Sequence, residues 1–198
     1  MAGSGVKKTV GILALQGDFE AHSKALERAG AEPVLVRTAE DLKNIDGLVF
    51  PGGESTTMLK LVNFMELREP LMEFAREKPV FGTCAGAILL AKEVRNPAQD
   101  SFGVIDMTVE RNAYGRQIDS RVANIHPASE FEKRAGRGDM EAVFIRAPII
   151  RRAGPDVRVL AQYEGDPVLV EQGRHLVATF HPELTQDPRV HKLFLSKL

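Results

Sequence analysis

The chain has 198 residues, of which 43% are hydrophobic and 27% are charged, as in a folded globular protein and unlike a disordered one. Its formal net charge of -1 gives no general attraction to nucleic acid or to an anionic membrane, so we expect neither as a partner. The single cysteine excludes an intrachain disulfide and favours a reducing compartment, which predicts a cytoplasmic protein.

The first half of the chain alternates apolar segments with amphipathic ones. Continuous apolar runs predict buried strands at residues 10–15, 34–36, 46–50 and 80–81. Helices are predicted from Asp18, as the N-cap, to Gly30, and over residues 70–76 and 85–91. A further helix after Thr56 places one apolar face at Met58, Leu61, Val62 and Met65. This alternation predicts an α/β fold of three layers around a mainly parallel, doubly wound sheet.

The second half of the chain has a different pattern, with strands and no long helix between them. The strands are predicted at residues 102–110, 120–125, 142–145, 157–163, 167–171 and 175–180. Hairpin turns are predicted at Gly165-Asp166 and Gln172-Gly173, and a surface loop at residues 130–139. We expect these strands to add antiparallel members to one edge of the sheet.

Asp187-Pro188 opens a last helix, whose apolar positions include Val190 and Phe194. No linker composition is evident, so residues 1–198 are predicted to form one domain, with residues 1–8 as a flexible leader. The first apolar run, residues 10–15, is too short for a signal peptide or a membrane span.

Cys84 lies between a predicted strand and a predicted helix, in the pattern Gly82-x-Cys84-x-Gly86. A side chain at such a sharp turn points out of the packing, and flanking glycines allow the backbones to approach closely. The amides that begin the following helix favour a thiolate and a developing anion. A nucleophilic role competes with a simpler one, because free cysteines are often small buried hydrophobic residues.

His181 and Glu183 supply what a nucleophilic thiol needs. His181 follows an apolar strand and can accept the thiol proton, while Glu183 can orient its imidazole through the other ring nitrogen. The protonated imidazole can then donate to a departing amine, which is the chemistry of acyl transfer. The four other histidines lack such a setting.

Two further segments carry polar groups that suit a ligand. Gly52 and Gly53 follow a buried strand, where successive glycine amides can form an anion-binding nest, although a plain turn fits as well. A phosphate-binding loop is disfavoured because the Gly-Lys-Ser/Thr ending is missing. Arg111 or Arg116 can hold a substrate carboxylate, as can Arg146, or each can belong to a solvated loop or an ion pair.

Taken together, these motifs resemble a known family. Gly82-Thr-Cys-Ala-Gly86 with His181-Pro-Glu183 resembles the class I, triad-type glutamine amidotransferases. Within that class, five segments are similar to the glutaminase subunits of pyridoxal 5′-phosphate synthases. These segments lie at residues 15–22, 51–56, 110–117, 144–148 and 180–184.

The resemblance implies a specific activity. Cys84 is expected to form a γ-glutamyl thioester with L-glutamine, with His181 as base and then acid and Glu183 as its orienter. Backbone amides around Gly52-Gly53 and after Cys84 are expected to form the oxyanion hole. The positions implied to contact glutamine are Gly52, Gly53, Glu54, Arg111, Ile145 and Arg146. No cofactor and no metal are implied.

The resemblance also implies a protein partner. Ammonia is expected to pass to a synthase subunit that makes pyridoxal 5′-phosphate, in an assembly of about twelve copies of each subunit, as the family pattern has it. The glutaminase is expected to be nearly inactive until the synthase docks near Gln16-Gly17. Three alternatives remain: a glutaminase of another pathway, a non-enzymatic redox-sensing relative, and a cysteine hydrolase acting on peptides.

Overall fold

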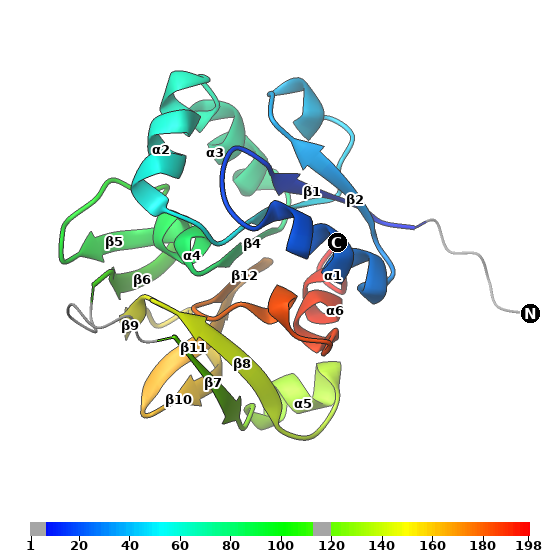
Figure 1. The fold of residues 1–198 in the computed structure, drawn as a ribbon, viewed down its shortest axis with the longest axis vertical. Coiled ribbons are helices and arrows are strands. Elements are labelled where there is room, and N and C mark those ends of the chain that lie inside the picture. Colours follow the sequence, from blue (N-terminus) through cyan, green and yellow to red (C-terminus); the bar gives the residue numbers. More distant parts are fainter. Residues whose placement is uncertain (1–6, 113–119) are drawn as a thin grey trace, which may run out of the picture.

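The computed structural model describes residues 7–112 and 120–198. Most of the predicted leader, and residues 113–117 of the segment that contains Arg116, lie outside the described residues. The centre of the fold is a seven-stranded sheet with the order β10-β11-β12-β4-β3-β1-β2 (Figure 1).

Five strands of this sheet run parallel. They are β1 (Thr9–Leu13), β2 (Glu32–Val36), β3 (Gly47–Phe50), β4 (Val80–Thr83) and β12 (His175–Ala178). Every residue of β3 and β4 is buried, as expected for strands covered on both faces. Because β2 and β3 lie on opposite sides of β1, the winding reverses there, which confirms the predicted doubly wound sheet.

Helices cover both faces of the sheet. One apolar core includes α1 (Phe19–Ala29), α5 (Ser129–Ala135) and α6 (Arg189–Leu195). The opposite core includes α2 (Ser55–Phe64), α3 (Arg68–Glu77) and α4 (Ala85–Leu90). Two short 3-10 turns, η1 (Glu40–Leu42) and η2 (Pro182–Leu184), complete the helical elements of the described residues. The predicted three-layer arrangement is therefore confirmed.

The antiparallel extension of the sheet is confirmed for two strands, β10 (Arg158–Tyr163) and β11 (Asp166–Gln172). Their hairpins turn at Glu164-Gly165 and Gly173-Arg174, each one residue away from the predicted position. Glu164, Gly165 and Gly173 adopt positive φ angles of 51°, 88° and 57°. The left-handed backbone at these turns explains why glycine marks both of them.

The expectation of antiparallel members at one edge is wrong for the other strands predicted in the second half. β12 lies inside the large sheet and pairs parallel with β4. β5 (Ala91–Arg95), β6 (Ile105–Glu110) and β9 (Ile149–Ala153) form a separate three-stranded sheet. β7 (Ser120–Ile125) and β8 (Met140–Ile145) form a two-stranded one. β5 and β9 were not predicted, because each contains two adjacent exposed charged residues and neither shows an apolar run or a regular alternation.

Three local predictions also need correction. Residues 130–139 are not all loop, because α5 forms around the fully buried Phe131. The buried face of α2 contains Leu59 and not Met65, which is 41% exposed. Asp18 stands at the N-cap of α1, but its side chain makes no capping hydrogen bond.

Within the described residues, every helix is too short or too polar to cross a bilayer.

Candidate active site

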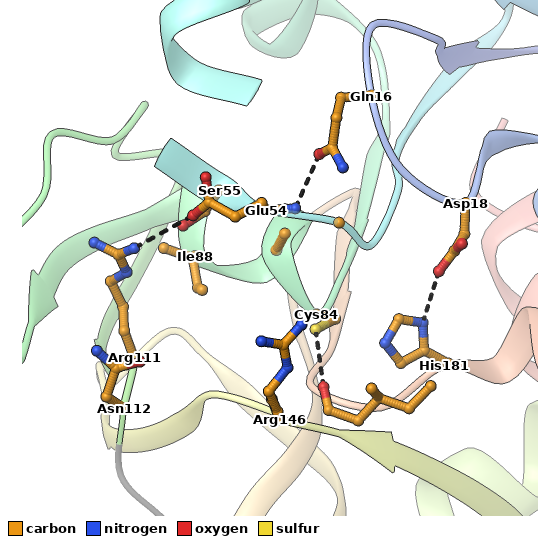
Figure 2. A pocket seen from close by; sticks show the side chains of 13 residues that line it. Gln16, Asp18, Glu54, Ser55, Cys84, Ile88, Arg111, Asn112, Arg146 and His181 are labelled. Carbon is orange, nitrogen blue, oxygen red and sulfur yellow. Dashed lines mark hydrogen bonds and ion pairs between the residues drawn. The ribbon is translucent and has the colours of Figure 1, made fainter. Parts of the chain in front are cut away.

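Loops that follow parallel strands meet around one cavity of about 320 Å³ (Figure 2). Gln16 and Asp18 follow β1, Gly53 and Glu54 follow β3, Cys84 follows β4, and His181 follows β12. Open α/β sheets bind ligands at the carboxyl ends of their strands, beside the point where the winding reverses. The volume suits a small metabolite.

Cys84 occupies the sharp turn that the sequence predicts. Its φ of 47° and ψ of -104° are rare for a residue with a side chain, and its amide donates to the Ala178 carbonyl at 3.0 Å. A Cβ on Gly82 would lie 2.7 Å from the carbonyl carbon of Gly86, and a Cβ on Gly86 would overlap the Phe50 carbonyl oxygen, so both positions require glycine. The thiol lies at the cavity, 3.8 Å from the Ile145 carbonyl oxygen.

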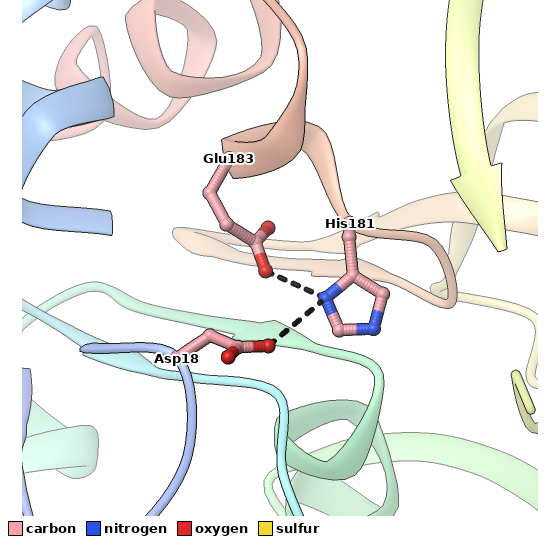
Figure 3. Close-up of side chains that lie close together, drawn as sticks. All are labelled: Asp18, His181 and Glu183. Carbon is pink, nitrogen blue, oxygen red and sulfur yellow. Dashed lines mark hydrogen bonds and ion pairs between the residues drawn. The ribbon is translucent and has the colours of Figure 1, made fainter. Parts of the chain in front are cut away.

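His181 and Glu183 form a buried pair beside Cys84. The ring Nδ1 of His181 lies 2.6 Å from Glu183 Oε1 and 3.8 Å from Asp18 Oδ2 (Figure 3). The main-chain amide of His181 donates to the Val143 carbonyl at 2.8 Å. With Nδ1 directed at carboxylates, the other ring nitrogen is left for the thiol.

His181 and Glu183 each stabilise the charged form of the other. Burial alone lowers the pKa of His181, but hydrogen bonds with Cys84 and Glu183 outweigh it and raise the pKa to about 10. Burial alone raises the pKa of Glu183, but the neighbouring His22 and the bond with His181 lower it to about 2. The site therefore favours an imidazolium held by a carboxylate, next to a thiol.

Gly52 does not line the cavity but lies against the His181 ring. A Cβ added to Gly52 would overlap Cε1 of that ring, so only glycine fits there. The Gly52 carbonyl accepts a hydrogen bond from the Asp18 amide at 3.0 Å. Because the peptide is planar and trans, the Gly53 N–H points in the opposite direction.

Glu54 lines the cavity and also caps a helix. Its carboxylate accepts hydrogen bonds from the amides of Thr56 and Thr57 at 3.1 and 2.7 Å, at the start of α2. Burial raises the pKa of Glu54, but these bonds prevail and lower it to about 2. Its own amide donates to Gln16 Oε1 at 2.9 Å, which joins the loops after β1 and β3.

Two arginines reach the same cavity. Arg111 donates from Nη2 to Thr56 Oγ1 at 2.9 Å and lies 3.7 Å from Glu54 Oε1. Arg146 has a φ of 45°, and Figure 2 shows both guanidinium groups among the lining side chains. Ile145 lines the cavity as well. All the sequence-predicted site residues in the described part of the chain are therefore brought together, with Gly52 placed behind His181.

Sequence reasoning missed the setting of three polar side chains. Asp18 was predicted only as a helix cap, yet its carboxylate faces His181. His22 and His191 were given no role, yet both are buried and His22 lies 3.4 Å from Glu183. His22 lies on the same face of α1 as the buried Ala25 and Leu26, so the helical period can identify a buried polar group but not its partner.

Asp18, His181 and Glu183 also bring potential metal ligands within 4.8 Å of one another. A cation bound there would compete for His181 Nδ1, which Glu183 already engages at 2.6 Å. The arrangement therefore suits a hydrogen-bonded triad better than a metal centre.

Comparison with known proteins places this geometry in a family. The model of the SNO glutamine amidotransferase family matches residues 12–198. The chain is 68% identical over 191 residues to "Pyridoxal 5'-phosphate synthase subunit PdxT" of Solibacter usitatus (strain Ellin6076), covering 96% of this chain and 100% of that protein. It is 56% identical over 186 residues to the protein of the same name from Koribacter versatilis (strain Ellin345), covering 94% of this chain and 93% of that protein.

A solved structure described as "Crystal structure of glutamine amidotransferase" matches with a TM-score of 0.86 and 46% identity, over 95% of this chain and 97% of that chain. These comparisons confirm both the predicted α/β fold and the resemblance inferred from the motifs. The chain belongs to the SNO glutamine amidotransferase family.

Proposed function

We propose that this chain is the glutaminase subunit of a pyridoxal 5′-phosphate synthase and hydrolyses L-glutamine to L-glutamate and ammonia. The observation that carries the proposal is the buried Glu183–His181 bond of 2.6 Å beside Cys84 on its strained turn. The relatives named above as synthase subunits supply the pathway, the biosynthesis of vitamin B6.

The reaction runs in two acyl-transfer steps. His181 holds the proton of Cys84, and the thiolate attacks the side-chain carbonyl carbon of glutamine. His181 then gives the proton to the departing nitrogen, which leaves as ammonia. The γ-glutamyl group remains bound to Cys84 as a thioester. Water attacks the thioester with His181 again as base, and glutamate and the free thiol are regenerated. Glu183 holds the imidazole and balances its charge throughout.

The cavity lining suits an amino acid with two charged groups. We assign the substrate carboxylate to Arg111 and Arg146, because guanidinium groups bind carboxylates in a planar, two-bond geometry. Glu54 offers a carboxylate for the ammonium group. The Gly53 N–H and the amides after Cys84 are assigned to the oxyanion of the intermediate, supported by the Gly52 carbonyl being held by Asp18.

We propose that the ammonia passes to a synthase subunit, in an assembly of about twelve copies of each as in the family pattern. Gln16 lines the cavity and Gly17 lies against the backbone of Gly52, and these two residues are the proposed docking region. The whole chain is proposed to act as one amidotransferase domain, because the family model matches residues 12–198 and the cavity draws on residues from Gln16 to His181. The required free thiol supports a cytoplasmic location.

The test is the release of glutamate from glutamine by the purified chain, alone and with a pyridoxal 5′-phosphate synthase subunit added. We expect little activity alone and strong activation by the synthase. Cys84→Ala should reduce activity to background, a loss on the order of 10⁶-fold for nucleophiles of comparable triads. Because Cys84 is the only cysteine, labelling by diazo-oxo-norleucine reports on this residue alone.

The outcomes separate the alternatives. High activity of the chain alone, unchanged by the synthase, would keep the glutaminase activity and remove its gating by docking. Persistent turnover in Cys84→Ala contradicts the mechanism. No activity and no labelling in either condition favours the redox-sensing relative, and cleavage of peptides favours a cysteine hydrolase.

A further inference from the structure

A chain of buried polar groups continues behind the triad. His22 belongs to α1. Its Nε2 atom lies 3.4 Å from Glu183 Oε2 and 2.9 Å from Thr83 Oγ1. Its Nδ1 lies 3.1 Å from Nε2 of His191 on α6. His22 and Thr83 have no exposed surface and His191 is 1% exposed, so water does not satisfy these groups.

The carboxylate fixes the direction of the hydrogen bonds in this chain. Glu183 accepts only, so attraction between Nε2 of His22 and Glu183 Oε2 requires a proton on Nε2. Nδ1 of His22 then has a lone pair, and it accepts from the Nε2–H of His191. The His191 N–H therefore donates to His22. The His22 N–H lies between Thr83 Oγ1, its hydrogen-bond partner at 2.9 Å, and Glu183 Oε2 at 3.4 Å.

Both rings in this chain are neutral at pH 7. Burial is the largest cause at both rings: it lowers the pKa of His22, and it lowers the pKa of His191 to about 3. The chain thus presents dipoles to Glu183 without adding a full charge. Within the described residues, Glu183 Oε2 has no hydrogen-bond partner, and His22 Nε2 lies 3.4 Å from it.

We propose that His22 is a positioning residue of the active site, which holds the carboxylate of Glu183 towards His181 and ties it to the strand that carries the nucleophile. Thr83 is the last residue of β4 and directly precedes Cys84. His22 contacts both Thr83 and Glu183, so one ring links the elements that present the acid and the thiol. This inference rests on the proposed glutaminase function.

His22 occupies a position in the core where an apolar side chain would be expected. The ring packs at 86° to Phe81 with 6.2 Å between centroids, in an otherwise apolar core. Burying imidazole in such a core is unfavourable without compensating hydrogen bonds. The compensation here comes from the groups that set up the triad, which points to a role beyond packing.

The test compares His22→Leu with His22→Gln in the complex of the full chain with a synthase subunit. Leucine fills the space without a donor, whereas the Gln side-chain amide can restore an N–H near the Nε2 position. His22→Leu should lower kcat by about 10- to 100-fold, because it removes the polar contact of a buried carboxylate, with KM nearly unchanged. His22→Gln should recover most of that loss.

The matched control is His175→Leu, at a second largely buried histidine whose Nδ1 accepts from the Val80 amide. This variant should lose stability while kcat stays at the wild-type value. A His22→Leu variant with wild-type kcat, or a His22→Gln variant as slow as His22→Leu, would overturn the proposal. An inactive wild-type complex would instead contradict the proposed function.

A measurement on the unmodified chain covers the case in which His22→Leu fails to fold. Side-chain ¹⁵N NMR of the histidines assigns the proton of each neutral ring. We expect His22 and His191 to be neutral at pH 7 with the proton on Nε2. A proton on Nδ1 of His22 would contradict the arrangement, whatever the activity assay gives.

Discussion

At the scale of single residues, Cys84 combines a rare backbone conformation with a buried thiol. A positive φ with a side chain costs on the order of 1–3 kcal/mol and persists only where the surroundings enforce it. Here the bond from the Cys84 amide to the Ala178 carbonyl and the contact between Gly82 and Gly86 enforce it. The strained turn directs the sulfur into the cavity beside His181.

Replacing His181, the proposed base, should lower the rate of glutamate release without lowering the affinity for the synthase subunit. His181→Asn removes the group that holds the thiol proton, so glutamate release should fall by about 10²- to 10⁴-fold. Because His181 is 3% exposed, its loss leaves the outer surface almost unchanged. Affinity for the synthase subunit, measured by analytical ultracentrifugation, should stay within about threefold, less than 1 kcal/mol.

His175→Asn is the control for this variant, since its ring lies outside the cavity and contacts the Val80 amide. It should keep both activity and affinity. A loss of affinity in His181→Asn as large as its loss of activity would contradict the role assigned to His181.

At the scale of elements, α2 shows how far a helical period determines burial. Met58 and Met65 lie seven residues apart and so project from nearly the same side of an α-helix. Met58 is fully buried, whereas Met65 comes after the last helical residue, Phe64, and is 41% exposed. The period identifies the apolar stripe, but the length of the helix decides which end of the stripe reaches the core.

The two methionines make a matched pair for a stability test. Met58→Ala removes buried side-chain atoms and leaves a cavity, so the free energy of unfolding should fall by about 2–4 kcal/mol. Met65→Ala should change it by less than about 1 kcal/mol. Urea denaturation of both variants measures the difference, and equal losses would show that Met65 is packed in solution.

At the scale of the whole molecule, the fold buries histidines that must stay uncharged. Burial lowers the pKa of His175 to about 4 and of His191 to about 3, and it lowers the pKa of His22 as well. In the unfolded chain such groups titrate near pH 6.5. Below that pH the unfolded chain binds protons that the folded chain does not, so acid favours unfolding.

Stability should therefore fall between pH 7.5 and pH 5.5. Each neutral histidine stabilises the folded chain fully above pH 6.5. This stabilisation is lost as the pH falls towards the pKa that the histidine has in the folded chain. The free energy of unfolding should drop by about 1.4 kcal/mol for each such histidine between these two pH values. Urea titrations at both pH values measure the drop, and His191→Gln should reduce it.

His126→Gln is the control for the pH experiment. His126 is exposed, and its hydrogen bond with Asp139 raises its pKa, so its stabilisation is lost as pH rises and not as it falls. This variant should keep the acid-side loss of the wild type. An equal drop in wild type and His191→Gln would show that His191 is not a source of the pH dependence.

The sequence by itself predicted four of the five parallel strands and the three residues proposed as the triad. Buried parallel strands are continuous apolar runs, and the turn at Cys84 needs glycines at fixed positions on either side of it. His181 and Glu183 follow such a run directly. These features are local in the chain, so composition and spacing were enough to predict them.

The tertiary structure alone decided which distant groups meet. β5, β9 and α5 depend on contacts with other segments, and their own patterns are too short or too charged to indicate them. Asp18 and His22 come from the start of α1, yet they approach a histidine and a glutamate near the end of the chain. Such contacts arise because the parallel order of the strands brings their carboxyl ends to one edge, and no local period in the sequence records that order.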